Sequence, residues 1–102
     1  MNRFGERIRK LREDNNMLLR HLAAKLDIDS AQLSKIERGE RGAKREQVAL
    51  LAEIFKVNKE ELLSLWLAAK VFEVLKDEDE PHKAIKVAEK ELKYLKHKKK
   101  ND

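Results

Sequence analysis

The sequence predicts an all-α protein: a bundle of five helices, with a long fifth helix and an additional sixth helix at the C-terminus. The composition is rich in Lys, Glu, Arg, Leu and Ala, with 1 Pro and 3 Gly, and poor in the residues that strands favour. Apolar residues recur at spacings of three and four, which is the period of a helix with one buried face. Short connections between these stretches indicate a compact bundle.

The first two helices are predicted from apolar spacing and from the polar segment between them. Residues 2–14 form the first helix, and the sequence DNN at 14–16 ends it. The second helix begins near Leu18 or Leu19 and ends near Asp27. Their expected inward-facing residues are Phe4, Ile8, Leu11, Leu22, Ala23 and Leu26.

The third and fourth helices carry clear end signals. Asp29 is an N-cap residue, and Gln32 stands at the third helical position, as in a capping box. Gly39 supplies the left-handed residue that ends the third helix. The fourth helix spans about 44–55, after the loop ERGAK. Their expected inward-facing residues are Leu33, Ile36, Val48, Leu51, Ala52 and Phe55.

The fifth helix follows a second capping box, Asn58 with Glu61, and continues to about Lys76. It is apolar nearly all round, so it must be covered on several sides. An acidic turn follows, and Pro81 suits the first position of a sixth helix, which frays near His97. The sixth helix places Ile85, Ala88, Leu92 and Leu95 on one stripe.

Charge is distributed unevenly along the 102 residues, whose formal net charge is +5. All eight arginines lie within the first 45 residues, and every later cation is lysine. The arginine fork fits phosphate groups and guanine edges, whereas lysine often serves solubility. One interpretation is surface solvation alone. The sharper interpretation places a polyanion-binding surface in the N-terminal half.

Several classes of protein are disfavoured by what the sequence lacks. It has no cysteine, hence no disulfide or thiolate metal site, which fits a cytoplasmic location. The first residues do not resemble a signal peptide, and the longest apolar run, 65–69, is too short to span a membrane. His21, His82 and His97 share no metal-binding spacing, and there is no glycine-rich phosphate loop. We therefore expect no enzyme activity, metal or cofactor.

The second and third helices have the spacing of a helix-turn-helix. Leu22 and Ala23 face inward, a turn follows at 27–29, and Leu33 and Ile36 pack back. The small side chain of Ala23 allows two helices to approach closely at a steep angle. In this arrangement the second helix enters the major groove of DNA.

The motifs IRKLRE, LAAKLDI, QLSKIERG, LLAEIFKV and NKEEL occur in this order from about Phe4 to Leu63. In them the chain resembles the lambda-repressor-like (Xre-type) helix-turn-helix domains. The resemblance implies that the five-helix bundle, within residues 1–64, is the DNA-binding domain of a transcriptional regulator. Such a domain would bind an operator of double-stranded DNA sequence-specifically, with the third helix in the major groove.

The resemblance also implies roles for individual residues. Glu37 matches the family's buried glutamate, and its partner is Arg12 of the first helix, so this pair is expected to brace the fold. Lys35 can reach guanine O6 and N7. For Gln32, helix capping is preferred over base contact. The candidates for base contact are Ser30, Ala31, Gln32, Ser34 and Lys35, and those for phosphate contact are Arg20, Arg38, Arg41 and Lys44.

Three positions depart from the family pattern. Leu18 and Leu19 stand where the family usually has Ser-Gln, so the usual phosphate contact at the start of the second helix is absent. Arg20 is the candidate replacement. Asp27 replaces the turn glycine, and a left-handed conformation costs aspartate little. Ala43 replaces a common proline.

The C-terminal segment is expected to form a helical hairpin at 65–97, continuous with the fifth helix, and a flexible basic tail at 98–102. One helix-turn-helix reads few base pairs, so we expect a homodimer on a palindromic operator, acting as a repressor. The alternative is an antitoxin-type regulator that binds a partner protein through these helices. Restriction–modification controllers and phage-type repressors have a similar length. The expected dimer interface comprises Trp66, Ala69, Phe72, Ile85, Leu92 and Leu95.

Overall fold

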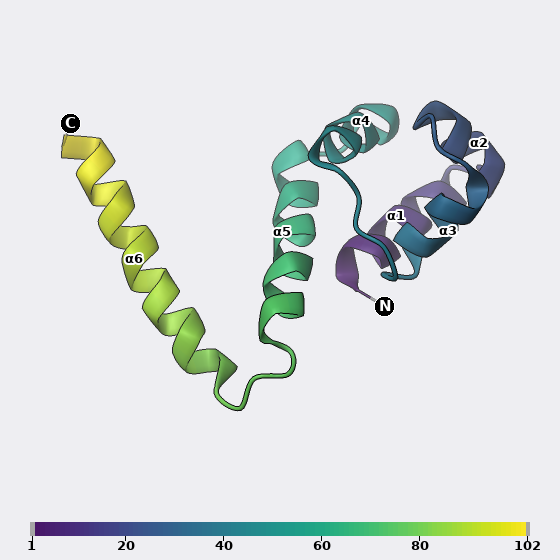
Figure 1. The fold of residues 1–102 in the computed structure, drawn as a ribbon. Helices are drawn as coiled ribbons and strands as arrows, with labels where there is room; N and C mark the ends of the chain where they lie inside the picture. The colour runs from purple at the N-terminus through teal and green to yellow at the C-terminus, as the bar shows by residue number, and fades with distance from the viewer. Residues whose placement is uncertain (1, 102) are drawn as a thin grey trace. The chain divides into compact units, whose positions relative to one another are not determined.

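The computed structural model describes residues 2–101, and within them the side chains of residues 2–99. This part of the chain contains helices but no strand, which confirms the predicted fold class. Figure 1 shows the helices in chain order. They are α1 (Arg3–Asp14), α2 (Leu19–Lys25), α3 (Ser30–Glu37), α4 (Arg45–Phe55), α5 (Lys59–Leu75) and α6 (Pro81–Asn101).

The chain divides into two compact units, Met1–Val71 and Phe72–Asp102. The hydrophobic core lies entirely in the first unit and draws on all of α1 to α5. Most of the predicted inward-facing residues are confirmed as buried, whereas Phe55 is only partly buried. The core residues are Phe4, Ile8, Leu11, Leu22, Ala23, Leu26, Leu33, Ile36, Ala43, Val48, Leu51, Ala52, Leu62 and Trp66.

The predicted helix ends are explained by their capping contacts. The side chain of Asp29 accepts a hydrogen bond of 2.7 Å from the backbone N–H of Gln32. Asn58 accepts one of 3.0 Å from the N–H of Glu61 in the same way. Each bond pairs an amide that the first helical turn would otherwise leave unsatisfied. Gly39 follows α3 with φ of 77°, as expected for a left-handed residue after a helix.

The last two helices differ from the sequence-based expectations. α5 ends at Leu75, and its buried residues are Leu62 and Trp66 alone. The first unit therefore buries α5 at these two residues, and the expected cover on its other sides is not found among the described residues of that unit. α6 remains helical to Asn101 instead of fraying near His97, so residues 98–101 of the expected flexible tail continue the helix. The last residue of that tail lies outside the described part.

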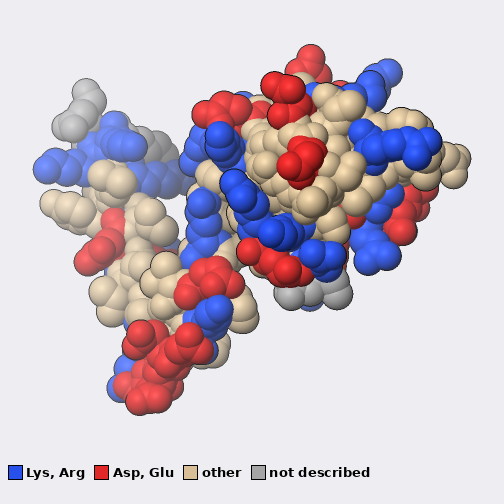
Figure 2. Space-filling model, turned by 45° about the vertical axis from the view of Figure 1, so that its right-hand side comes forward, with Lys and Arg blue, Asp and Glu red and all other residues tan. Residues whose placement is uncertain are grey.

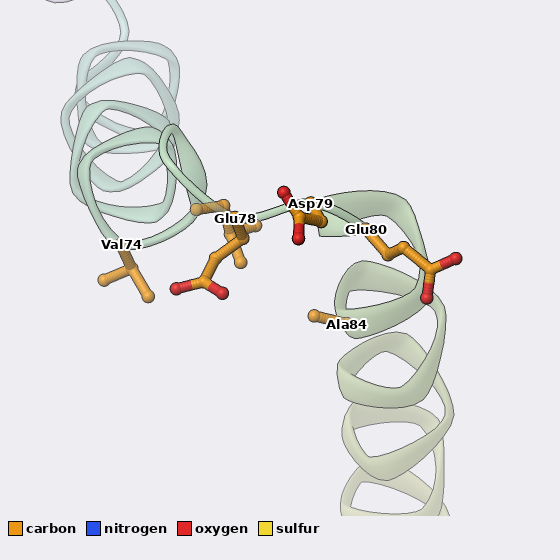
Figure 3. A pocket seen from close by; sticks show the side chains of 6 residues that line it. Val74, Glu78, Asp79, Glu80 and Ala84 are labelled. Carbon is orange, nitrogen blue, oxygen red and sulfur yellow. The ribbon is translucent and has the colours of Figure 1, made fainter.

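The connection between α5 and α6 carries the acidic residues expected there. Figure 3 shows the side chains that line an open pocket of about 380 Å³ at this connection. Apolar side chains of the two helices and three carboxylates share its wall. No group of His, Cys, Asp or Glu among the described residues is placed to hold a metal ion. The lining residues are Val74, Leu75, Glu78, Asp79, Glu80 and Ala84.

Candidate nucleic-acid interface

α2, the turn after it and α3 form the predicted helix-turn-helix. Leu22 and Leu33 are fully buried, and Ala23 is 2% exposed, so the two helices approach through a small side chain. Asp27 has φ of 58°, which confirms the left-handed conformation expected in place of the family's glycine. The N–H of Ile28 then bonds the carbonyl of Ala23 at 3.0 Å and closes the end of α2.

The start of α1 lies directly against the end of α3. A Cβ atom on Gly5 would lie 2.4 Å from the carbonyl oxygen of Glu37 and 2.7 Å from that of Ile36. Only glycine allows this approach without a shift of the backbone. Gly5 therefore fixes the position of α3, a role that the sequence analysis missed. The available signal was a glycine inside a helical pattern.

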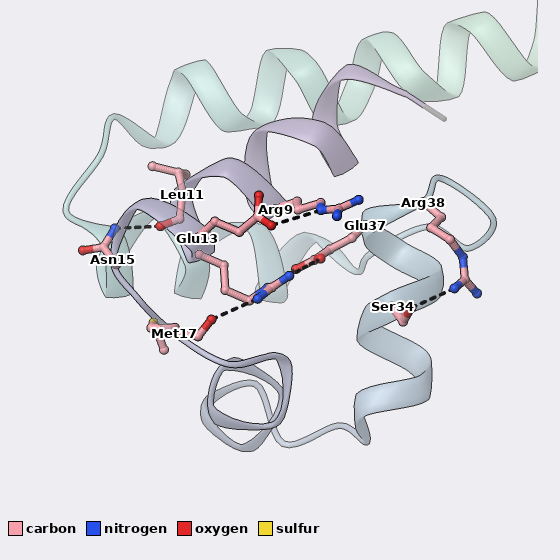
Figure 4. Close-up of polar contacts among 9 residues, drawn as sticks. Arg9, Leu11, Glu13, Asn15, Met17, Ser34, Glu37 and Arg38 are labelled. Carbon is pink, nitrogen blue, oxygen red and sulfur yellow. Dashed lines mark hydrogen bonds and ion pairs between the residues drawn. The ribbon is translucent and has the colours of Figure 1, made fainter.

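The expected ion pair between Arg12 and Glu37 joins α1 to α3. The guanidinium donates to both carboxylate oxygens, at 2.8 Å through Nε and at 3.1 Å through Nη2. Its Nη1 donates to the carbonyl oxygen of Met17 at 2.9 Å, which also ties the loop before α2 (Figure 4). The hydrogen bond to Glu37 raises the pKa of Arg12 above its usual value. Glu37 is 5% exposed, so this pair braces the bundle and is turned away from solvent.

The outward side of α3 carries the predicted base-contact residues. Ala31 and Lys35 are exposed, one helical turn apart, while Ser30, Gln32 and Ser34 are half-buried. Because the backbone N–H of Gln32 bonds Asp29, this position takes part in the helix cap. Its side chain stands among the other candidates at the start of α3. The first turns of α3 therefore present short side chains, with one lysine above them.

Arg38 has partners in the protein that the sequence analysis did not identify. Its Nη1 donates to the hydroxyl oxygen of Ser34 at 2.9 Å, a contact visible in Figure 4. Its Nε pairs with the carboxylate of Glu40. Both charged side chains are 54% exposed. The cation predicted to contact phosphate is thus held beside an acidic group at the end of α3.

The other predicted phosphate-contact residues are also on the surface. Arg20, Arg41 and Lys44 are all exposed. Arg41 and Lys44 belong to the loop between α3 and α4, whereas Arg20 lies on α2. Figure 2 shows basic side chains in several groups on one face of the molecule, with acidic side chains among them.

Trp66 has a different position from the expected one. It is 8% exposed and belongs to the core, and its indole N–H donates to the carbonyl oxygen of Ala43 at 2.8 Å. The cations of Arg45 and Lys70 lie 5.1 Å and 4.4 Å from its ring centre. Since its surface is already covered within one chain, Trp66 fixes the loop before α4 and is not free for a second protomer.

The remaining residues of the expected dimer interface are more accessible than Trp66. Ala69 is half-buried. The other four side chains are exposed by 41–65% and come from the second unit. They are Phe72, Ile85, Leu92 and Leu95.

The family described as "Helix-turn-helix domain" matches residues 5–66, which is more than half of the chain. The chain belongs to this helix-turn-helix family. Its matched region covers α2 and α3 together with the helices that position them. The predicted lambda-repressor-like resemblance is confirmed.

Two relatives from Bacillus subtilis (strain 168) are similar to the N-terminal region. The HTH-type transcriptional repressor RghR is 38% identical over 64 residues, which is 62% of this chain and 47% of RghR. The uncharacterized HTH-type transcriptional regulator RghRB is 38% identical over 65 residues, or 63% of this chain and 47% of RghRB. The chain therefore spans about half the length of these relatives. No solved structure matches it.

Family membership therefore identifies residues 5–66 as a helix-turn-helix DNA-binding domain of the transcription-regulator type. Within the described residues, no helix has the length and apolar character needed to cross a membrane.

Proposed function

We propose that the protein is a sequence-specific regulator of transcription that binds a palindromic DNA operator as a homodimer and represses the adjacent promoter. The observation that supports this most directly is the outward side of α3. Its first turns expose short side chains, and Lys35 stands one turn after Ala31. A helix of this kind can enter the major groove without steric obstruction, because no bulky side chain precedes the lysine.

Within the groove, Ser30, Ala31 and Ser34 face the base edges and Lys35 reaches the acceptors of a guanine. A lysine amine fits guanine O6 and N7, whereas the methyl group of alanine fits the thymine methyl. Gln32 remains mainly a capping position. Base contacts of this kind supply specificity, since phosphate contacts carry no sequence information directly.

Exposed cations around α3 then contact the phosphate backbone. Arg20 takes the place of the family's contact at the start of α2, where this chain has leucines. Arg41 and Lys44 contact the backbone from the loop after α3. Arg38 does so once its pairing with Glu40 is broken. Each such contact releases counterions, so binding should weaken steeply as salt is raised.

The homodimer follows from the size of the site. One helix-turn-helix reads few base pairs, and two-fold proteins of this class bind half-sites about 34 Å apart. The exposed apolar residues of the second unit, Phe72, Ile85, Leu92 and Leu95, supply surface for contact between protomers. The same surface supports a second candidate function, the binding of a partner protein in the manner of an antitoxin.

Selection of bound fragments from random duplex DNA tests the proposal. We expect an enriched palindrome whose half-sites are one helical turn apart. On this site Lys35→Ala should cost about 1–3 kcal/mol and relax the preference at one base pair. Arg41→Ala should weaken specific and nonspecific binding alike and flatten the salt slope by about one unit. Lys90→Ala on α6 is the control that removes one cation far along the sequence from α3.

The absence of any enriched sequence at moderate salt would contradict sequence-specific binding. Unchanged operator binding by Lys35→Ala would contradict the assignment of α3 as the reading helix. A monomer at micromolar concentration that forms a stable complex with a co-expressed protein would instead favour the partner-binding function. Sedimentation velocity distinguishes that result from the homodimer.

A further inference from the structure

α6 carries an apolar stripe that is exposed within the second unit. Ile85, Ala88, Leu92 and Leu95 follow one another at spacings of three, four and three, so they lie on one face of the helix. Ala88 is exposed, and the other three side chains are exposed by 41%, 65% and 48%. Their positions are a, d, a and d of two successive heptads, which is the pattern of a two-stranded coiled coil.

The opposite face of α6 carries lysines that are exposed to solvent. Lys83, Lys86, Lys90 and Lys93 occupy its outward positions, and all four are exposed. Val87 and Tyr94 lie beside these lysines and are exposed as well. The 85–95 stripe is nevertheless the apolar row that recurs in heptad register, and pairing along it leaves the lysines solvated.

Two charged residues beside the stripe have no possible ion-pair partner within the helix. Three and four positions from Glu91 stand Val, Ala, Tyr and Leu, so no cation is near enough on the helix. Lys96 has no carboxylate at those distances either. Glu89, by contrast, pairs with Lys93 at 3.2 Å. In heptad terms Glu91 is a g position and Lys96 the following e position, which face each other across two parallel helices.

We propose that α6 pairs with α6 of a second copy of this chain, side by side, parallel and in register. Each apolar residue then meets its own counterpart, and Glu91 of each protomer faces Lys96 of the other. This inference rests on the proposed dimeric function and names the surface and orientation of its interface.

Charge selects the parallel orientation over the antiparallel one. The antiparallel register that keeps all four apolar layers pairs Ile85 with Leu95 and Ala88 with Leu92. In that register Glu89 faces Glu89 and Glu91 faces Glu91 of the other protomer, and like charges repel there. The parallel register buries the same four layers and replaces these repulsions with two attractive pairs.

A cysteine cross-link tests the orientation in the full chain, which has no cysteine of its own. Lys99 is the next a position after Leu95, so Lys99→Cys should form a disulfide-linked dimer under mild oxidation. In the antiparallel register the two cysteines would be about 27 Å further apart along the helix axis, too far to bond. Lys90→Cys on the solvated face is the matched control and should stay largely monomeric under the same conditions.

Charge reversal tests the proposed contact by sedimentation equilibrium. Glu91→Lys alone and Lys96→Glu alone should each weaken dimerisation at least about tenfold, because each creates two like-charge contacts. The double variant should return to within about threefold of the original affinity. Lys90→Glu changes charge on the solvated face and should keep the affinity of dimerisation within about threefold of the original value.

Three results would overturn the inference: a monomer at 100 times the concentration needed for operator binding, a dimer that Lys99→Cys does not cross-link, or a double variant that binds no better than its parents. The selection of DNA fragments is independent of them. An enriched half-site with a monomeric protein would overturn the α6 pairing and leave DNA recognition by α3 standing. A cross-linked parallel dimer without any enriched DNA would support the α6 pairing and contradict DNA recognition by α3.

Discussion

The segments 2–71 and 72–99 both contain helices with apolar residues at spacings of three and four, but these residues are buried in the first segment and exposed in the second. In the first segment, α1 shows apolar residues at three and four spacing, and they are buried by neighbouring helices of the same chain. In the second segment, α6 shows the same spacing, yet none of its described side chains is buried. A helical period therefore predicts that a face will be covered, but it does not tell which chain supplies the cover.

Charged residues differ between the two segments in the same way. Glu37 is the one buried charged residue among those described, and Arg12 pairs with it through two hydrogen bonds. In the second segment the pairs are on the surface. Glu73 accepts from Lys76 at 2.9 Å and raises the pKa of this exposed lysine. A buried pair holds elements together, whereas exposed pairs contribute little to folding stability.

Truncation of one leucine in each segment should give the largest difference in the free energy of unfolding. Leu22→Ala removes a fully buried side chain and should lower the free energy of unfolding by about 3–5 kcal/mol. Leu92→Ala removes a side chain that is 65% exposed in the single chain and should cost less than about 0.5 kcal/mol at low protein concentration. Urea unfolding measures both. An equal loss from the two variants at low concentration would show that the chain itself covers Leu92.

Breaking the buried ion pair should give the second-largest loss of stability. Glu37→Ala leaves Arg12, whose side chain is 13% exposed, without its partner and should cost about 2–3 kcal/mol. Because the pair raises an already high pKa, the contribution of Arg12 is complete below the usual arginine pKa and should not change between about pH 6 and 9. Glu89→Ala removes the exposed partner of Lys93 and is the control, with a change below about 0.5 kcal/mol.

Alanine substitutions at two glycines, one closely packed and one on open surface, should differ in their effect on stability. Gly5→Ala places a methyl group 2.4 Å from a backbone oxygen at the end of α3 and should cost about 1–2 kcal/mol, despite alanine's better helix propensity. Gly42→Ala meets no atom within 4 Å and should change stability by less than about 0.5 kcal/mol. Thermal or urea unfolding of both variants decides this. A stabilised Gly5→Ala would mean that α1 and α3 can separate without loss.

Local features of the first segment could be predicted because each depends on residues near in sequence. Asp29, Asn58 and Gly39 act within one helical turn, and the structure places them as helix-end residues. The Arg12–Glu37 pair joins residues 25 apart, and it was predicted through the family resemblance and not from periodicity.

The errors concern contacts between distant segments. The sequence marks Trp66 as a large apolar residue on an apolar helix, which fits an interface as well as a core. Only the fold brings it to the carbonyl of Ala43, 23 residues away. The close approach of Gly5 to the end of α3 was equally hidden, because a glycine in a helix does not name its neighbour. The partner of α6 is not fixed by periodicity either, and charge pattern is the guide to it.

The smallest expected effect is a change in DNA affinity when the carboxylate of an exposed ion pair is neutralised. Two such pairs are compared, one beside α3 and one in the second segment. In the free protein the carboxylate of Glu40 pairs with Arg38, and in the proposed complex a DNA phosphate takes its place. Glu40→Gln should therefore raise affinity for any duplex about two- to fivefold, with a steeper salt dependence. Glu73→Gln makes the same change of charge at the partner of Lys76 and controls for net charge. Fluorescence anisotropy with labelled duplex at several salt concentrations measures both variants. Equal gains would mean that net charge alone acts, whereas a gain confined to Glu40→Gln would place the phosphate contact at Arg38.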